Sequence, residues 1–234
     1  MANSDPHSHD PAPKEAGAVP DRARRAGTDE SGKGDFFGPL VVAAVAADFE
    51  QVVRLNDWGV IDSKKLSDGR ALKLAAQLKD AQIPHAVVAI GPEKYNELYA
   101  RIRNLNRLLA WAHARAIENL LDQVDVSVVI ADQFGDESLI ERSLFEKGRR
   151  VQLIQMPRAE QDTVVAAASV LARAEFLRRL DSLGRDLGIT LPKGAGAPVD
   201  AAGAQVIRQF GLDRLKSVAK CHFKNFQKAQ NAAH

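Results

Sequence analysis

Two adjacent carboxylates, Asp29 and Glu30, lie in the glycine-rich segment GTDESGKGDFFGP, which begins at Gly27. The first seven residues of this segment fit the phosphate-binding pattern G-x-x-x-x-G-K, but that pattern needs Ser or Thr next and Gly34 stands there. The flanks also disagree with a nucleotide-binding loop, because the stretch before Gly27 is short and polar and the Val/Ala run after Phe36 is typical of a strand. Two anions would repel a phosphate unless a cation lay between them, so the pair indicates a site for Mg²⁺ or Mn²⁺.

Apolar runs and helical periodicity alternate along the chain, and they predict the elements that must position this pair. Runs rich in Val, Ala and Ile predict strands over 36–49, 85–91, 126–132 and 151–156, and a brief strand could include 26–29. A helix is expected after a loop that ends at Ser67, which is a plausible cap. Further helices are predicted over 95–121, 162–184, 200–211 and 212–229. Interleaved strands and helices indicate an α/β domain built on a central sheet.

Length and composition indicate one globular domain with a tail. The chain has 234 residues, of which 45% are hydrophobic and 26% charged, and its formal net charge of +2 says little about a polyanionic partner. Residues 1–25 lack an apolar period, so we expect a disordered tail before a domain over 26–234. Cys221 is the single cysteine, which rules out an internal disulfide and suits a reducing cytoplasm. No apolar run approaches the ~18 residues of a membrane span, so we expect no contact with a membrane. We further expect a monomer located in the cytoplasm.

Several blocks in register resemble ribonuclease HIII, a member of the type 2 ribonuclease H family. After GTDESGKGDFFGP come, in the order expected for that family, DSKKLSD (62–68), NLNRLLAWAHARAI (104–117), ADQF (131–134), AEQDTVVAAASVLARAEFL (159–177), LPKGA (191–195) and AKCHFKNFQKA (219–229). The resemblance covers essentially everything from about residue 26 onward, and ESGKG and HFKN favour the HIII type over the HII type. It implies an α/β, RNase H-like fold with a central mixed five-stranded sheet flanked by helices, and helices at the C-terminal end.

The resemblance also implies an endonuclease that cuts the RNA strand of an RNA–DNA hybrid, with Mg²⁺ or Mn²⁺ in a two-metal site and no small-molecule cofactor. The four catalytic and metal-binding carboxylates of the family match Asp29, Glu30, Asp132 and Glu160. Asp162 takes the fourth role if the local alignment slips. The chemistry agrees, because two ions about 4 Å apart can activate water on one side of a phosphodiester and stabilise the leaving oxygen on the other. These acids also have structural alternatives. Asp132 could form a turn or cap a helix, and Glu160 and Asp162 could stabilise the N-terminus of the following helix.

By the same resemblance, the SGKG loop reads the 2′-hydroxyl that separates RNA from DNA, and nearby basic residues contact phosphates. The residues expected to bind nucleic acid are Ser31, Gly32, Lys33, Gly34, Ser63, Lys64, Lys65, Lys193, Lys220 and His222. A tight turn and a solvated lysine pair are the structural alternatives for these loops. His113 is expected to pack rather than to act, and Asn104 is expected either to cap a helix or to contact substrate.

Proteins of the HIII type commonly carry an N-terminal domain that resembles a TATA-binding protein. Only about 25 residues precede the first block here, so we expect weaker binding of the hybrid. Three other functions compete with hybrid cleavage. They are HII-like incision at single ribonucleotides embedded in duplex DNA, a non-catalytic module that binds hybrids, and a nucleotide-hydrolysing switch, which Gly34 argues against.

Overall fold

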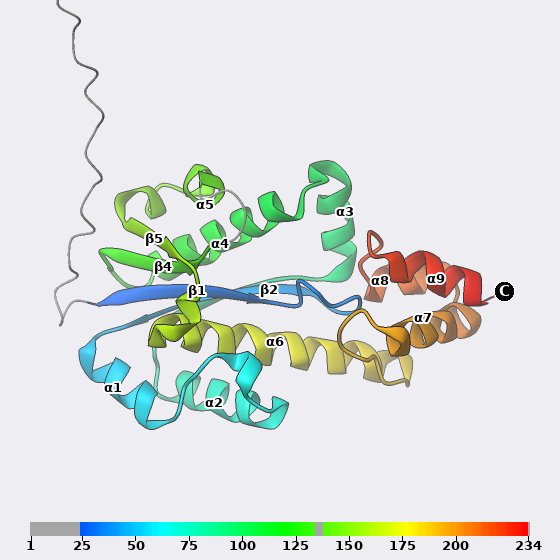
Figure 1. The fold of residues 1–234 in the computed structure, drawn as a ribbon, viewed down its shortest axis with the longest axis horizontal. Coiled ribbons are helices and arrows are strands. Elements are labelled where there is room, and N and C mark those ends of the chain that lie inside the picture. The colour runs from blue at the N-terminus through cyan, green and yellow to red at the C-terminus, as the bar shows by residue number, and fades with distance from the viewer. Residues whose placement is uncertain (1–23, 134–137, 234) are drawn as a thin grey trace, which may run out of the picture.

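The computed structural model describes residues 24–133 and 138–233, and a mixed five-stranded sheet lies at its centre (Figure 1). In spatial order the strands are β3 (His85–Ile90), β2 (Leu40–Ala47), β1 (Arg25–Ser31), β4 (Val128–Asp132) and β5 (Gln152–Met156). β1 pairs antiparallel with β2 and parallel with β4, so β1 and β4 end at the same edge of the sheet. Thr28 lies opposite Ala131 in that pairing, which places Asp29 and Asp132 at neighbouring strand ends. The predicted five-stranded mixed sheet is confirmed.

Helices cover both faces of the sheet and one end of it (Figure 1). On one face lie α1 (Phe49–Asp57), α2 (Asp68–Asp80) and α6 (Thr163–Leu187), and on the other lie α4 (Leu105–Leu121) and α5 (Ser138–Ser143). At the end nearest the C-terminus are α3 (Pro92–Ile102), α7 (Ala197–Phe210), α8 (Leu212–Val218) and α9 (Lys224–Ala233). The whole of β2, LVVAAVAA, is buried. Its alternate residues join two different apolar cores, as a strand covered on both faces requires.

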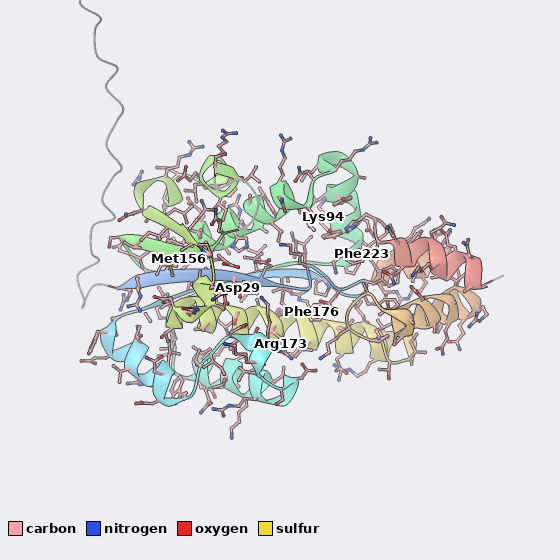
Figure 2. All side chains as sticks on the ribbon, in the orientation of Figure 1. Asp29, Lys94, Met156, Arg173, Phe176 and Phe223 are labelled. Carbon is pink, nitrogen blue, oxygen red and sulfur yellow. The ribbon has the colours of Figure 1, made fainter. Side chains whose placement is uncertain are left out.

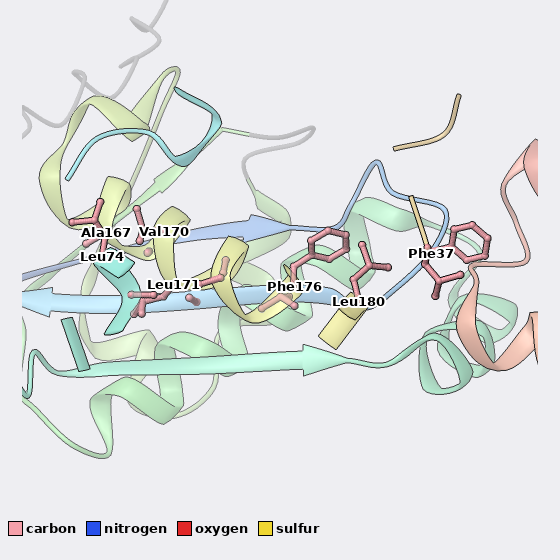
Figure 3. Close-up of a cluster of buried hydrophobic side chains, with 14 of the residues drawn as sticks. Phe37, Leu74, Ala167, Val170, Leu171, Phe176 and Leu180 are labelled. Carbon is pink, nitrogen blue, oxygen red and sulfur yellow. The ribbon is translucent and has the colours of Figure 1, made fainter. Parts of the chain in front are cut away.

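The helix α6 begins directly against the central strand. A Cβ at Gly27 would lie only 2.8 Å from Val165 Cα, so the absence of a side chain lets β1 touch the first turn of α6. Farther along, α6 buries Val170, Leu171 and Phe176 in the core that Figure 3 shows. This packing fixes the N-terminal end of α6 beside the strand that carries the acidic pair.

The single helix predicted over 95–121 is wrong, because the chain forms two helices there. Arg103 adopts the left-handed conformation (φ 49°) and ends α3, where its N–H donates to the carbonyl of Tyr99. The side chain of Asn104 then accepts from the N–H of Arg107 at 3.0 Å and begins α4. Asn104 is therefore a helix cap in this structure.

The helix predicted over 212–229 also divides in two. Ala219 forms a β-bridge with Phe37, and the N–H of Lys220 donates to the carbonyl of Phe36 at 2.9 Å. These backbone bonds to a distant loop interrupt the helix between Val218 and Lys224.

Local capping residues set two further element boundaries, of which one agrees with the prediction from sequence and one differs. Ser67 accepts from the N–H of Arg70 and caps α2, which confirms the predicted cap. The strand predicted to reach Phe49 ends earlier, because Asp48 forms a capping box and begins α1. Of the predicted tail, residues 1–23 lie outside the described residues.

We expect Gly27→Ala to destabilise the fold, because the new methyl group would clash with the backbone of Val164 and Val165. Overpacking of this kind costs about 1–3 kcal/mol, measured as a lower free energy of unfolding in urea. Gly69→Ala is the matched control, since a Cβ there meets nothing within 4 Å. Equal stability of both variants would contradict the close contact between β1 and α6.

Candidate active site

A cleft of about 450 Å³ opens at the edge of the sheet where β1 and β4 end. Asp29 and Glu30 enter it from β1, and Asp132 enters from β4. The other lining residues come from the β1–β2 loop, the 63–64 turn, α6 and the 191–195 loop: Ser31, Gly32, Lys33, Gly34, Asp35, Ser63, Lys64, Arg173, Phe176, Leu177 and Lys193. Figure 2 shows Asp29 on the central strand, with Arg173 and Phe176 along the neighbouring helix α6.

The surroundings of Asp29 disfavour its ionised form. Burial raises the pKa of Asp29 well above its usual range, and the negative charges of Glu30 and Asp132 raise it further. A hydrogen bond from the N–H of Glu30 to Asp29 Oδ1 (2.8 Å) and the charge of Lys64 oppose this only in part. An additional positive charge nearby would therefore favour the ionised form of Asp29.

Glu30 lies beside Asp29 but in the opposite electrostatic environment. Burial alone would raise its pKa, but His113 and Lys33 outweigh burial and lower the pKa of Glu30 to about 2. His113 Nε2 lies 3.3 Å from Glu30 Oε2, and Lys33 Nζ lies 3.5 Å from Oε1. Glu30 is therefore a fixed anion with a cationic or donor group on each oxygen.

Two acids compete for the role of fourth carboxylate. Asp162 caps α6 by accepting from the N–H of Val164 (2.9 Å), and its other oxygen pairs with Arg25 at 3.2 Å. Glu160 lies in the short 3₁₀ helix just before α6, and its charge acts on Lys64, which also faces Asp29. Because Asp162 is engaged in structural contacts, these positions favour Glu160, although Glu160 does not itself line the cleft.

The glycine-rich loop forms one wall of the cleft, and its shape depends on Gly32. Gly32 has φ +85°, and a Cβ there would meet Phe176 Cδ2 at 2.8 Å and the carbonyl of Pro39. The segment leads from β1 to β2 rather than from a strand to a helix, so it lacks the geometry of a nucleotide-binding loop.

The 62–66 turn is anchored to α6 by two side chains. The N–H of Ser63 donates to Ser169 Oγ at 3.0 Å, and the Arg173 guanidinium donates to the carbonyl of Ser63. Arg173 and Lys193 both pair with Asp68. This network holds Lys64 at the cleft, while Lys65 is exposed and does not line it.

Two residues predicted to contact nucleic acid lie elsewhere. Lys220 is 0% exposed, so the prediction that it contacts phosphate does not fit this structure. Its ammonium donates to the carbonyls of Asp35 (2.7 Å) and Gly38 (2.9 Å), and so it supports the loop behind the cleft. His222 stacks on Tyr99, with ring centroids 4.1 Å apart, and lies outside the residues that line the cleft.

Two residues at the site, His113 and Arg173, were not predicted from the sequence to have a functional role. His113 is 1% exposed on α4 and contacts Glu30, where only packing was expected. A histidine on an apolar helix face carries no local signal of such a contact, because its partner is 83 residues away. Arg173 lies on the core-facing part of α6, where periodicity alone indicates packing.

The donor set fits a hard divalent cation. Among residues 24–133 and 138–233, no three His, Cys, Asp or Glu side chains converge closely enough to form a metal-binding group by themselves. The excess negative charge acts on Lys64: burial lowers the pKa of Lys64, but the charges of Asp29, Asp62, Glu160 and Glu30 outweigh burial and raise it. Oxygen ligands and excess negative charge are what Mg²⁺ and Mn²⁺ require.

Comparisons with known proteins agree with this geometry. A family model described as Ribonuclease HII matches residues 26–226. The chain belongs to this ribonuclease family. It is 48% identical to the ribonuclease HIII of Protochlamydia amoebophila, covering 85% of this chain and 65% of that protein, and 46% identical to the ribonuclease HIII of Chlamydia pneumoniae, covering 86% and 68%. The chain thus spans about two thirds of the length of these relatives.

Solved structures of the family share the fold. The crystal structure of Bst-RNase HIII in complex with Mn²⁺ is 34% identical, with a TM-score of 0.85, and the match covers 99% of this chain and 77% of that chain. The ribonuclease H2 of Pyrococcus horikoshii is 26% identical with a TM-score of 0.75, over 89% and 97%. The predicted RNase H-like fold and the predicted family are therefore confirmed. No helix in the described part of the chain is long and apolar enough to cross a membrane.

We expect Lys220→Met to destabilise the fold by about 1–3 kcal/mol, because the carbonyls of Asp35 and Gly38 would lose their donor. Burial lowers the pKa of Lys220 from its usual 10.5 to about 7, although the charge of Asp35 opposes this. Between these two values the unfolded chain binds the proton and the folded chain does not. Stability contributed by this group therefore rises as pH increases from about 7 to 10.5.

Urea unfolding at pH 7 and pH 9.5 measures both effects. The difference in stability between wild type and Lys220→Met should be larger at pH 9.5. Lys228→Met is the matched control, since Lys228 is largely exposed and should show neither effect. If the difference in free energy of unfolding between wild type and Lys220→Met were the same at both pH values, Lys220 would not be a buried titrating group.

Proposed function

We propose that this chain is a divalent-metal-dependent endoribonuclease that hydrolyses the RNA strand of RNA–DNA hybrids. The observation that carries the proposal is that Asp29, Glu30 and Asp132 line one cleft, with the half-buried Asp29 beside like charges. A phosphodiester brings more negative charge to this place, so bound metal cations would make its approach more favourable. Membership of the ribonuclease HII and HIII group supports the choice of substrate.

The acidic residues would hold the metal. Asp29, Glu30 and Asp132 would supply carboxylate oxygens directly at the cleft, and Glu160 would supply a fourth from the 3₁₀ helix before α6. When bound, two Mg²⁺ or Mn²⁺ ions activate a water molecule and stabilise the leaving oxygen of the phosphodiester. Lys64, which also lines the cleft, would be available to contact a phosphate oxygen.

Loops around the cleft would select and position the hybrid. The SGKG loop (31–34) brings backbone groups close to the acidic pair, where they can contact the 2′-hydroxyl next to the scissile bond. Lys33, Lys64 and Lys193 line the same cleft and would contact phosphates. Ser63 lines the cleft and shapes the 62–66 turn. Lys65 and His222 do not line the cleft, so any contact that they make with nucleic acid would lie outside it. Every residue named in this proposal belongs to one chain, so a monomer would suffice for the reaction. We propose that it acts in the cytoplasm.

Incision at single ribonucleotides in duplex DNA is the second candidate. The observation that favours it is the matching family model, which is described as Ribonuclease HII. The hybrid is preferred because the curated relatives at 43–48% identity are named ribonuclease HIII.

We expect Asp132→Asn to reduce cleavage of a uniform hybrid by on the order of 10²–10³-fold, since it removes a ligand charge worth several kcal/mol in the transition state. Binding of the hybrid should change little, as measured by fluorescence anisotropy in Ca²⁺. Asp125→Asn is the matched control, because Asp125 is exposed before β4 and lies outside the cleft. Full activity of Asp132→Asn would refute the carboxylate site.

A substrate panel separates the two candidate activities. Wild-type protein should cut a uniform RNA–DNA hybrid at several positions in Mg²⁺ or Mn²⁺ and should lose this activity in EDTA. Its activity on a duplex with one embedded ribonucleotide should be lower. Preferential incision of the second substrate would support the HII-like candidate, and undiminished activity in EDTA would contradict the metal dependence.

A further inference from the structure

A buried chain of polar groups runs from the sheet through α4 to the acidic pair. Thr28 is 0% exposed on β1, and its Oγ1 lies 2.9 Å from the carbonyl oxygen of Ala43 and 3.0 Å from His113 Nδ1. The opposite ring nitrogen, Nε2, lies 3.3 Å from Glu30 Oε2. The ring is therefore held at one nitrogen by the sheet and presents the other nitrogen to a carboxylate.

The chemistry of these partners fixes which nitrogen carries a hydrogen toward Glu30. When the Thr28 hydroxyl donates to Ala43, it accepts from Nδ1–H, and the contact with Glu30 needs a hydrogen on Nε2 as well. When the hydroxyl instead donates to Nδ1, the neutral ring carries its hydrogen on Nε2. In both arrangements Nε2–H donates to the carboxylate, because an ionised carboxylate can only accept.

We propose that His113 is a positioning residue that fixes the Glu30 carboxylate for metal binding. This inference rests on the proposed function. The contact with Nε2–H holds Oε2 on the side of α4, and Oε1 faces the more exposed Lys33 at the cleft. A fixed carboxylate loses less conformational freedom when it binds an ion, and groups that orient metal ligands typically contribute 10–100-fold to metal affinity or activity.

The position of His113 in the core supports this role over simple packing. Its immediate surroundings on α4 are apolar: Leu109, Ala112, Ala116 and Ile117 are all buried. A polar ring at such a place costs free energy unless its nitrogens are bonded, and here both are. An apolar side chain would fill the space without that requirement, so packing alone does not call for histidine.

Mn²⁺ titration by calorimetry on the full chain, together with thermal unfolding in EDTA, tests the inference. His113→Asn places an amide near Nδ1 only, so it keeps the contact with Thr28 but does not reach Glu30. His113→Gln extends an amide to the position of Nε2. We expect Mn²⁺ affinity to fall about tenfold in His113→Asn and to remain within about threefold of wild type in His113→Gln.

Two further variants separate positioning from packing. Leu109→Ala removes buried apolar contacts on the same helix without touching Glu30, so it should lower the melting temperature and leave Mn²⁺ affinity unchanged. Thr28→Val removes the hydroxyl that contacts His113 Nδ1, so it should lower Mn²⁺ affinity. This variant tests the positioning role even if His113→Asn fails to fold.

The outcomes are distinct from those that test the proposed function. Unchanged Mn²⁺ affinity in His113→Asn or in Thr28→Val, each shown to be folded, would overturn the positioning role while the metal site stands. Absence of Mn²⁺ binding in wild type would overturn both. Loss of affinity in His113→Asn with recovery in His113→Gln supports the positioning role.

Discussion

A carboxylate that is buried beside other carboxylates is unstable as an anion, and this constraint underlies the whole site. Asp29 lies at the end of the central strand with Glu30 next to it and Asp132 on the adjacent strand. The charge of Lys64 offsets part of the repulsion. A protein gains nothing in stability from such an arrangement, which supports the proposal that these carboxylates bind cations.

Each layer of the fold contributes one part of this site. The parallel pairing of β1 with β4 brings two strand ends together, and the glycine at position 27 lets the first turn of α6 pack directly against β1. On the opposite face, α4 reaches Glu30 through His113. The C-terminal helices act at longer range, because buried Lys220 holds the carbonyls of the loop that follows the acidic pair.

Features written in local sequence could be predicted, and features that depend on distant partners could not. Apolar runs located the strands, and the segment GTDESGKGDFFGP with its neighbouring blocks identified the family. The same blocks predicted Asp29, Glu30 and Asp132 as site residues, and these three line the cleft. The break at Arg103 was missed because apolar periodicity continues across it, and only the left-handed backbone and the Asn104 cap reveal two helices. Lys220 was expected at the surface, yet its partners lie more than 180 residues earlier in the chain.

The most direct test of the central claim is a crystal of the full chain soaked in Mn²⁺, with the ions located by anomalous scattering. The account predicts anomalous density between Asp29, Glu30 and Asp132, at about 2.0–2.4 Å from their oxygens. Mn²⁺ bound only elsewhere, with no density at these three carboxylates, would contradict the account.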